Sequence, residues 1–242
     1  MLREMSSTYG RSPGGYAWAI LEPFGTILML SFGFSLMLRS PSLGSSFILF
    51  YATGYLPFNM FQTLSRVTAN ALTFSQALLN YPTVLWIDAV AARIFLNLLT
   101  DILVAFVLLT SIVLLSGLTI TLSFGPIIAA FGSAALLGVG VGLLNGVLFG
   151  FFPAWKTIWG IITRPLFLAS GVILIFEDLP PFAGNILWWN PLMHITGKMR
   201  EGFYSIYSPQ YISLPLVTLL SLILICYGLM LMRRYQRKLL EL

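Results

Sequence analysis

Charged residues divide this chain into long apolar stretches. No Asp, Glu, Lys or Arg occurs between Arg39 and Arg66, within residues 102–155, or between Glu201 and Arg233. A helix needs about 20 residues to cross the hydrocarbon core of a bilayer, so the middle stretch can hold two such helices joined by a tight turn. The turn is predicted at Gly117–Pro126, because a Gly-Pro pair interrupts the apolar pattern there.

The pattern predicts an all-α integral membrane protein with six transmembrane helices in a single domain over residues 1–242. Strand-like alternation is missing, which disfavours a β-barrel. The predicted spans are Ala17–Leu38, Ser46–Leu64, Ile94–Leu115, Ile127–Phe151, Thr157–Phe176 and Leu214–Met232.

Composition supports the same class of protein. Charged residues make up 9% of the chain and hydrophobic residues 58%, against roughly 25% charged residues in soluble domains. A soluble fold of this length needs a charged surface that this chain cannot supply. A cytosolic enzyme, a secreted disulfide scaffold and a nucleic-acid binder are therefore excluded, and Cys226, the only cysteine, cannot form an intrachain disulfide.

The basic residues predict the orientation, because Lys and Arg concentrate on the cytoplasmic side of a membrane. With both termini in the cytoplasm, only Arg39, Lys198 and Arg200 fall outside. Ten basic residues then lie inside or near the inner interface: Arg3, Arg11, Arg66, Arg93, Lys156, Arg164, Arg233, Arg234, Arg237 and Lys238. The N-terminal residues lack the apolar core of a signal peptide, so the first span is expected to direct insertion.

Residues 66–93, between the second and third spans, predict a short cytoplasmic helix. Val67, Ala71, Phe74 and Leu78 recur at three- and four-residue steps and so share one helical face. Tyr81-Pro82 ends the pattern, since the residue before a proline disfavours helix. The apolar face of so short a helix needs either the membrane surface or a groove in another protein, and the pattern leaves both open.

The fourth predicted span carries a glycine every four residues, at Gly138, Gly142, Gly146 and Gly150. Stacked small residues let a second helix approach closely. Tight packing within the chain is the expected role, and a sliding or gating surface is the alternative.

Residues 177–213 are too polar for a span and too aromatic for a plain loop. Pro180-Pro181 and Asn190-Pro191 divide them into two pieces of about ten residues, a length that suits re-entrant or interfacial helices. An aromatic belt at the membrane interface explains some of the rings, and apolar contact with a passing substrate is a second role for them. The rings are Phe182, Trp188, Trp189, Phe203, Tyr204, Tyr207 and Tyr211.

Catalytic and metal-binding chemistry is sparse in this sequence. No phosphate-binding loop of the form G-x-x-x-x-G-K-[ST] occurs, so the chain is not expected to hydrolyse ATP. A single histidine excludes a multi-histidine metal site, and we assign no catalytic residue and no metal ligand. Two alternatives stay open: an ion-coupled carrier that uses Asp101, and an intramembrane enzyme that uses Ser170 and His194.

A series of short motifs extends over nearly the whole chain: Gly15-Tyr16-Ala17-Trp18 with Glu22-Pro23, Gly54-Tyr55-Leu56-Pro57, Leu79-Asn80-Tyr81-Pro82, Thr163-Arg164-Pro165, Trp189-Asn190-Pro191-Leu192 and Arg200-Glu201-Gly202-Phe203. In this order they resemble the membrane subunits of ABC-2-type exporters, and among these the capsular-polysaccharide permeases. Related O-antigen and teichoic-acid permeases carry an Arg-Asp pair soon after the fourth span. Residues 145–155 lack that pair, which favours the capsule branch, with export of O-antigen or teichoic acid as the alternative.

The resemblance implies roles for the three segments that are not simple spans. Residues 1–16 become a cytoplasmic N-terminal arm beside the coupling segment 66–93, and residues 177–213 become a periplasmic gate segment. Contact with an ATPase subunit is implied for Asn70, Phe74, Gln76, Leu78, Tyr81 and Pro82. Contact with the substrate path or gate is implied for Trp188, Trp189, Tyr204 and Tyr207.

The same resemblance implies the partners and the location. Two copies of the chain and two ATP-binding cassette subunits would form an exporter in the bacterial inner membrane, with ATP and Mg²⁺ on the partner subunits and no cofactor in this chain. The substrate would be a lipid-linked capsular polysaccharide, passed on to periplasmic and outer-membrane export proteins. Nucleic acid is not an expected partner.

Overall fold

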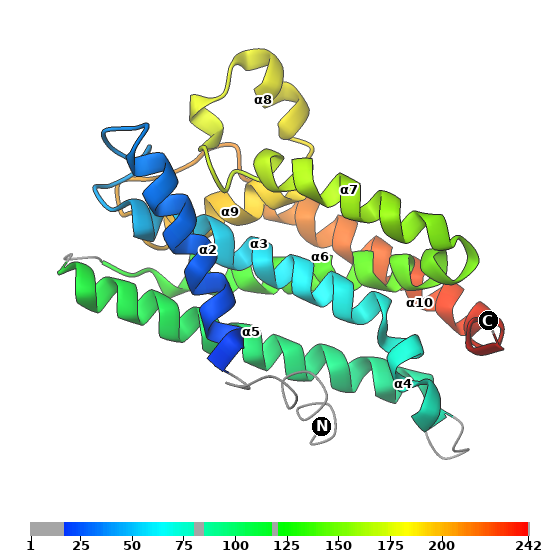
Figure 1. Cartoon of the computed structure of the whole chain (residues 1–242). Helices are drawn as coiled ribbons and strands as arrows, with labels where there is room; N and C mark the ends of the chain where they lie inside the picture. Colours follow the sequence, from blue (N-terminus) through cyan, green and yellow to red (C-terminus); the bar gives the residue numbers. More distant parts are fainter. Residues whose placement is uncertain (1–16, 80–84, 118–120, 242) are drawn as a thin grey trace.

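The computed structural model describes residues 17–79, 85–117 and 121–241, and this part of the chain is helical without a strand, as the pattern predicted. Long helices form a bundle, and the short helix α8 stands away from it (Figure 1). In chain order the elements are α2 (Ala17–Ser35), α3 (Phe47–Ala69), α4 (Ala71–Leu79), α5 (Trp86–Ser116), α6 (Phe124–Phe151), α7 (Pro153–Ala169), the 3₁₀ turn η1 (Phe176–Asp178), α8 (Pro181–Leu187), α9 (Pro191–Glu201) and α10 (Leu214–Glu241).

Four described helices are long and apolar enough to cross a membrane: α2, α5, α6 and the part of α10 from Leu214 to Gln236. The second and fifth predicted spans form helices too, α3 and α7, but neither is among these four. Polar residues such as Asn59 and Arg66 lower the hydropathy of α3, and α7 has only 17 residues. Six spans and their orientation therefore remain predictions.

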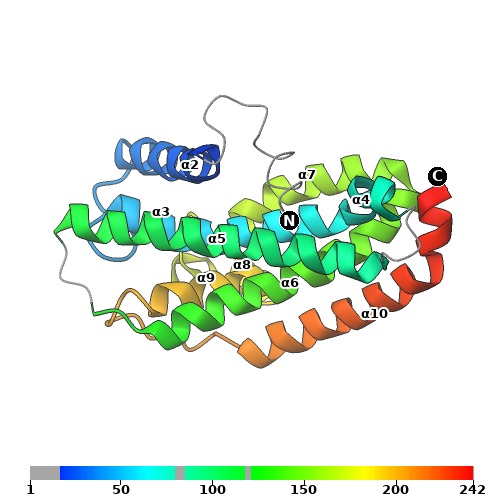
Figure 2. The same cartoon turned by 90° about the horizontal axis from the view of Figure 1, so that it is seen from below.

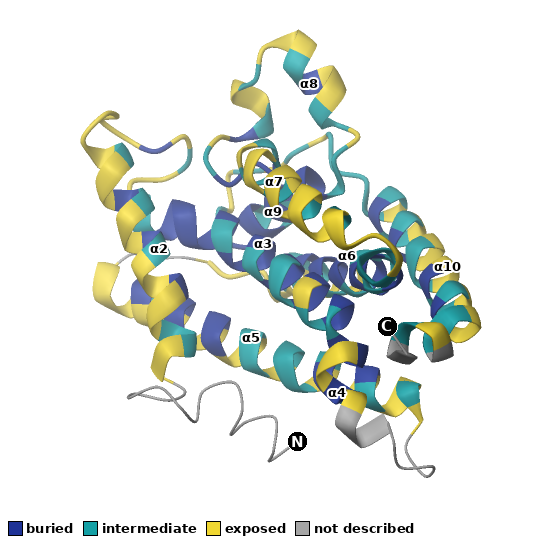
Figure 3. Cartoon of the chain, turned by 45° about the vertical axis from the view of Figure 1, so that its right-hand side comes forward, coloured by how far each residue is buried: buried dark blue, intermediate teal, exposed yellow. Residues whose placement is uncertain are grey.

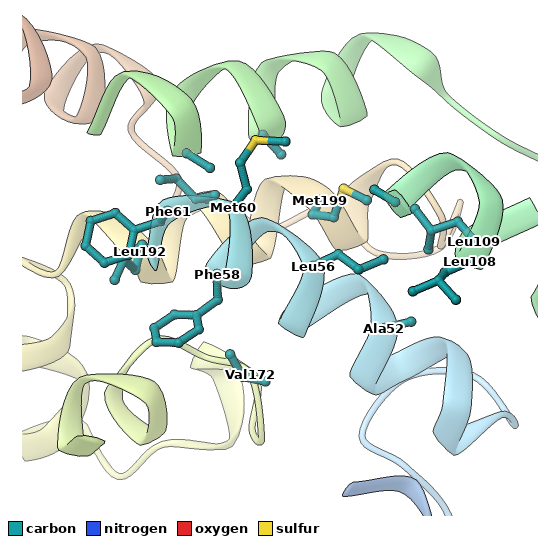
Figure 4. Packing of buried hydrophobic residues seen from close by; sticks show 14 of the residues in the cluster. Ala52, Leu56, Phe58, Met60, Phe61, Leu108, Leu109, Val172, Leu192 and Met199 are labelled. Atoms are coloured by element: carbon teal, nitrogen blue, oxygen red, sulfur yellow. The ribbon is translucent and has the colours of Figure 1, made fainter. Parts of the chain in front are cut away.

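Helix α3 is the centre of the bundle and packs against α2, α5, α6 and α9. Most of its length is buried, which explains how it tolerates polar residues that a lipid-facing helix would not. Figure 4 shows Phe58 and Phe61 of α3 beside Leu192 of α9, with Val172 beneath Phe58. The core of the protein is therefore built around a helix shielded from lipid by its neighbours.

The glycines of α6 lie where other helices approach its backbone. A Cβ at Gly138 would lie 2.8 Å from the carbonyl oxygen of Phe61 in α3, and one at Gly142 would lie 2.7 Å from that of Ser65. At Gly146 and Gly150 the nearest atoms are side-chain carbons of α10. Figure 2 shows α10 running along α6. This glycine stripe thus contacts α3 over its first part and α10 at its end, and Gly146 lies close to both helices.

Several helix ends differ from the predicted boundaries. The fifth helix ends at Ala169 rather than Phe176, because Gly171 adopts φ +72°, a left-handed conformation that ends the helix. The third helix begins eight residues early, at Trp86, and the second continues to Ala69, so both enter the predicted coupling segment. The last helix continues through the basic cluster to Glu241.

Residues 177–213 fold as two short helices, and each begins at a proline that the sequence marked. Pro181 starts α8 and Pro191 starts α9, since proline is favoured in the first turn, where its missing N–H is not needed. Asn190 caps α9 by accepting a hydrogen bond from the Leu192 backbone N–H.

Helices α2 and α7 are the least enclosed long helices. Figure 3 shows mostly exposed positions along both, and α7 has no buried residue within its bounds. Large apolar side chains are open on each, with Met29 79% and Leu168 62% exposed. Lipid or another protein must cover these surfaces, because water would not stabilise so large an apolar area.

The contacts at Gly142 predict a stability difference between two glycines of α6. We expect Gly142→Ala to lower the free energy of unfolding by about 1–3 kcal/mol, because the new methyl would meet Thr68 and Ser65 of α3. Gly132→Ala is the matched control, since no atom lies within 4 Å of its Cβ position. Thermal unfolding in detergent measures the difference. Equal melting temperatures for the two variants would contradict the packing role.

Candidate functional site

The junction of α3 and α4 is the first candidate region. Asn70 stands between the two helices, where its side-chain Nδ2 donates to the carbonyl oxygen of Arg66 at 2.7 Å. Ala71, Leu72 and Ser75 of α4 are buried, and the first two pack with Val147 of α6 and Met232 of α10. The short helix is therefore seated on the bundle. Val67 belongs to α3, so it does not share one continuous helix with Ala71 and Phe74 as the spacing predicted.

The opposite side of α4 is open. Phe74 is 48% exposed and Gln76 is exposed as well. Of the other predicted coupling residues, Asn70 lies at the helix junction and is half-buried, while Tyr81, Pro82 and the side chain of Leu78 lie outside the described residues. Phe74 and Gln76 are thus both exposed, about half a helical turn apart around α4.

Arg93 of α5 connects this junction to the bundle, whereas the sequence counted it only among the basic residues near the inner interface. It is 9% exposed, its Nη1 donates to the carbonyl oxygen of Asn70 at 3.3 Å, and its guanidinium lies 3.9 Å from the ring centroid of Phe74. A cation over an aromatic face is held electrostatically. A displacement of α4 would therefore act on α5 through these contacts of Arg93.

Two polar cavities flank the half of α3 nearest α4. One, of about 370 Å³, lies towards α6 and α7, and the other, of about 320 Å³, lies towards α2 and α5. Residues that line both are Glu22, Asn59, Thr63, Arg66 and Asn70. Polar groups at membrane depth are tolerated where they line such a space.

Asp101 lines the second cavity. Its Oδ2 atom is buried without a hydrogen-bond partner among the described residues. Arg66 is the basic residue whose charge acts on it across the cavity. An intramembrane carboxyl group that lines a polar cavity is the feature that the ion-coupled alternative requires.

At the α9 end of the bundle, Trp188 and His194 hold residues 177–213 together. The Trp188 indole N–H donates to the carbonyl oxygen of Tyr211 at 3.0 Å. The His194 ring is engaged at both nitrogens: Nε2 lies 2.7 Å from the carbonyl oxygen of Trp188, and Nδ1 accepts from the Ser213 backbone N–H at 3.2 Å. Trp188 was predicted as a substrate or gate contact, and the structure shows it bonded within the segment.

The other three predicted path residues differ in exposure. Trp189 is 70% exposed. Tyr204 and Tyr207 line a third cavity of about 370 Å³ with the loop before α3, and the Tyr207 hydroxyl donates to Glu177 at 3.0 Å. Burial raises the pKa of Tyr204 to about 12, so this hydroxyl stays neutral. Trp189, Tyr204 and Tyr207 are thus the members of the predicted set that can meet another molecule.

Ser170 and His194, the pair named for the enzyme alternative, do not contact each other. The Ser170 hydroxyl donates to the carbonyl oxygen of Leu166, and both residues are 0% exposed. A catalytic base needs a free nitrogen beside its nucleophile, whereas both nitrogens of His194 have backbone partners. The described geometry therefore gives the enzyme alternative no support.

The imidazole contacts predict a pH dependence of stability. Burial lowers the pKa of His194 below its ordinary value of 6.5, because the charged form loses its hydration. The unfolded chain then binds a proton that the folded protein excludes, so the stability present above about pH 6.5 is lost as the pH falls. We expect His194→Gln to reduce this loss between pH 7.5 and 5.5, measured as melting temperature in detergent. An identical pH dependence in both proteins would contradict the role.

Comparison with known proteins agrees with this architecture. The ABC-2 type transporter family matches residues 1–204. The chain is 31% identical over 235 residues to the polysialic acid transport protein KpsM of Escherichia coli, which covers 96% of this chain and 90% of the relative. It is 24% identical to the capsule polysaccharide export inner-membrane protein CtrC of Neisseria meningitidis serogroup B and 23% identical to BexB of Haemophilus influenzae, with 98% of this chain and 89% of each relative covered.

Two of these relatives are named as inner-membrane proteins, and the four long apolar helices fit that location. The inner-membrane location and the transport role predicted from the motifs are therefore confirmed. The family match, the near full-length relatives and the helical bundle agree, and the chain belongs to the ABC-2 type transporter family.

Proposed function

We propose that this chain is the permease subunit of an ATP-driven exporter that moves a lipid-linked capsular polysaccharide outward across the bacterial inner membrane. The observation that carries the proposal is the full-length similarity to three kinds of polysaccharide export protein. The missing phosphate-binding loop fits a subunit that obtains its energy from a partner. Export of O-antigen or teichoic acid is the alternative within the same reaction type.

In this proposal all six long helices cross the membrane and both termini lie in the cytoplasm. Helices α3 and α7 then act as spans that are too polar or too short to stand alone in lipid, and neighbouring helices shield them. The α4 end, which carries Arg66, Arg93 and the basic end of α10, faces the cytoplasm. The α8 and α9 end faces the periplasm, where it can meet periplasmic and outer-membrane export proteins.

Helix α4 is proposed as the coupling helix. Its exposed side chains Phe74 and Gln76 would enter a groove of an ATP-binding cassette subunit, while its buried side rests on α6 and α10. Through Arg93, a push on α4 would reach α5. ATP binding on two partner subunits would thus move helices of two permease copies as rigid bodies.

A second copy of the chain is proposed to cover the open surfaces of α2 and α7. The cavities beside α3 lie between these two helices and the core. Two copies facing each other would enclose a polar path along α3, which a single copy leaves open to lipid. Trp189, Tyr204 and Tyr207 would contact the substrate at the periplasmic end.

Reconstitution tests the whole proposal. The permease is expected to co-purify with an ATP-binding subunit, and vesicles that contain both are expected to transport acidic polysaccharide only with ATP. Transport by the permease alone on a proton gradient would contradict the proposal. A panel of capsular, O-antigen and teichoic-acid substrates in the same vesicles separates the alternatives.

The exposed ring of Phe74 predicts a coupling defect. We expect Phe74→Ala to weaken binding of the ATP-binding subunit by about fivefold or more, and to lower ATP-driven transport, because an aromatic side chain that fills a groove dominates such interfaces. Binding is measured by titration of the partner onto the detergent-solubilised permease. Thr73→Ala, an exposed neighbour on the same helix, is the control. Equal binding by both variants would remove α4 from the interface.

Asp101 separates ATP-driven export from ion-coupled transport. We expect Asp101→Asn to keep ATP-dependent transport within about twofold of the wild type, because the driving energy comes from the partner and not from a proton on this carboxyl group. Loss of transport with intact assembly and ATP hydrolysis would favour the ion-coupled carrier instead.

A further inference from the structure

Four backbone carbonyl groups at and after the end of α7 accept hydrogen bonds from side chains of one short segment, residues 190–200. Asn190 Nδ2 donates to the carbonyl oxygen of Ala169 and Thr196 Oγ1 to that of Ser170, each at 2.8 Å. Arg200 donates to the carbonyl oxygens of Val172 and Leu174, at 3.0 and 3.3 Å. We call Asn190, Thr196 and Arg200 the clamp.

These carbonyls need such partners. Ala169 ends α7, so its carbonyl group has no donor within the helix. Ser170, Val172 and Leu174 follow the helix, where no helical hydrogen-bond ladder supplies a donor. At Gly171 the chain turns with φ +72°, and a Cβ there would lie 2.6 Å from the Met193 sulfur and 2.8 Å from the Thr196 hydroxyl. The end of α7 is therefore pressed against α9 as well as hydrogen-bonded to it.

Arg200 extends the clamp to α3. The residue is 1% exposed, and its guanidinium lies 4.1 Å from the ring centroid of Phe50. A Cβ at Gly54, one turn further along α3, would lie 3.0 Å from the Arg200 Nη2 atom. Among the described residues no carboxylate pairs with Arg200, and Glu201 pairs with Lys198 instead. A buried charge without a counter-ion is unfavourable, and the two carbonyls and the ring are what stabilise it here.

The rest of α7 is held differently. No residue within its bounds is buried, and its first turn is fixed by a hydrogen bond from the Trp155 indole N–H to Asn145 of α6 at 3.0 Å. The two ends of α7 are thus fixed while the part between them is loosely packed, and Pro165 lies inside the helix near the clamp. A displacement of the first turn would reach the clamp along this helix.

We propose that Arg200 is a positioning residue for transport, which joins the end of α7, helix α9 and α3 into one rigid unit so that movement of α7 reaches residues 177–213. The proposal rests on the proposed function, in which the α4 end of the bundle is cytoplasmic and residues 177–213 form the periplasmic gate; the first turns of α7 share a cavity with Asn70 at that α4 end. It gives the chain a mechanical link between its two ends.

Spin-label distances between the two copies of the permease test the link. In a Cys226→Ser background, which removes the only cysteine, single labels are placed at Thr157→Cys and, separately, at Ile206→Cys. Both positions are exposed, at the first turns of α7 and in the segment after α9. With the ATP-binding subunit present, both distances are expected to change on addition of ATP and vanadate.

Arg200→Met is expected to keep the change at residue 157 and to abolish it at residue 206, with polysaccharide exported per ATP reduced about fivefold or more. Arg200→Lys is expected to behave like Arg200→Met, because an ammonium group cannot hold two carbonyls as a planar guanidinium does. Lys198→Met, on the same helix but outside the clamp, is the control and is expected to keep both changes.

A change at residue 206 that persists in Arg200→Met overturns the proposal. If Arg200→Met does not assemble, the double variant Asn190→Ala, Thr196→Val replaces it in the same distance measurement. This variant weakens the clamp without removing a buried charge. A wild-type protein in which neither distance responds to ATP overturns the proposed function itself and the proposal with it. Failure of the proposed link and failure of the proposed function are therefore distinguished by whether the wild-type distances respond to ATP.

Discussion

A backbone carbonyl at the end of a helix that is enclosed by the protein must find a donor inside it, and this requirement organises both ends of the bundle. At one end Arg93 donates a hydrogen bond to the carbonyl oxygen of Asn70, between α3 and α4. At the other end Arg200 donates hydrogen bonds to the carbonyl oxygens of Val172 and Leu174, which follow α7. Each guanidinium also faces a phenylalanine ring. The irregular segments that depart from plain helix are thus held by side chains far away in the sequence.

Close backbone packing divides the helices into a rigid part and a loosely held part. Glycines of α6 let α3 and α10 approach until a single methyl group would collide, and dispersion contacts at that distance make the three helices a stiff frame. Helices α2 and α7 lack such contacts along their length and keep large apolar surfaces open. Displacement within the chain is therefore expected along α7, between its first turn and the clamp, rather than inside the frame.

The arrangement separates the roles that an exporter requires. Polar cavities beside α3 form a polar region within an apolar chain, and α4 leaves the side that is proposed to meet a partner exposed. The chain has no phosphate-binding loop of its own. In the proposed exporter, displacement of α4 and of the start of α7 would be converted into changes at the far end, with an efficiency set by how stiffly those elements are joined.

The sequence by itself determined the membrane class, the helical fold, the glycine stripe and the starts of α8 and α9, because hydropathy, small-residue spacing and proline act locally. It also carried the motifs of the family. Only the tertiary structure decided that His194 is a bonded structural residue and that Arg93 and Arg200 join distant helices. Those outcomes depend on carbonyls and rings brought together over long sequence separations, where spacing along the chain gives no signal.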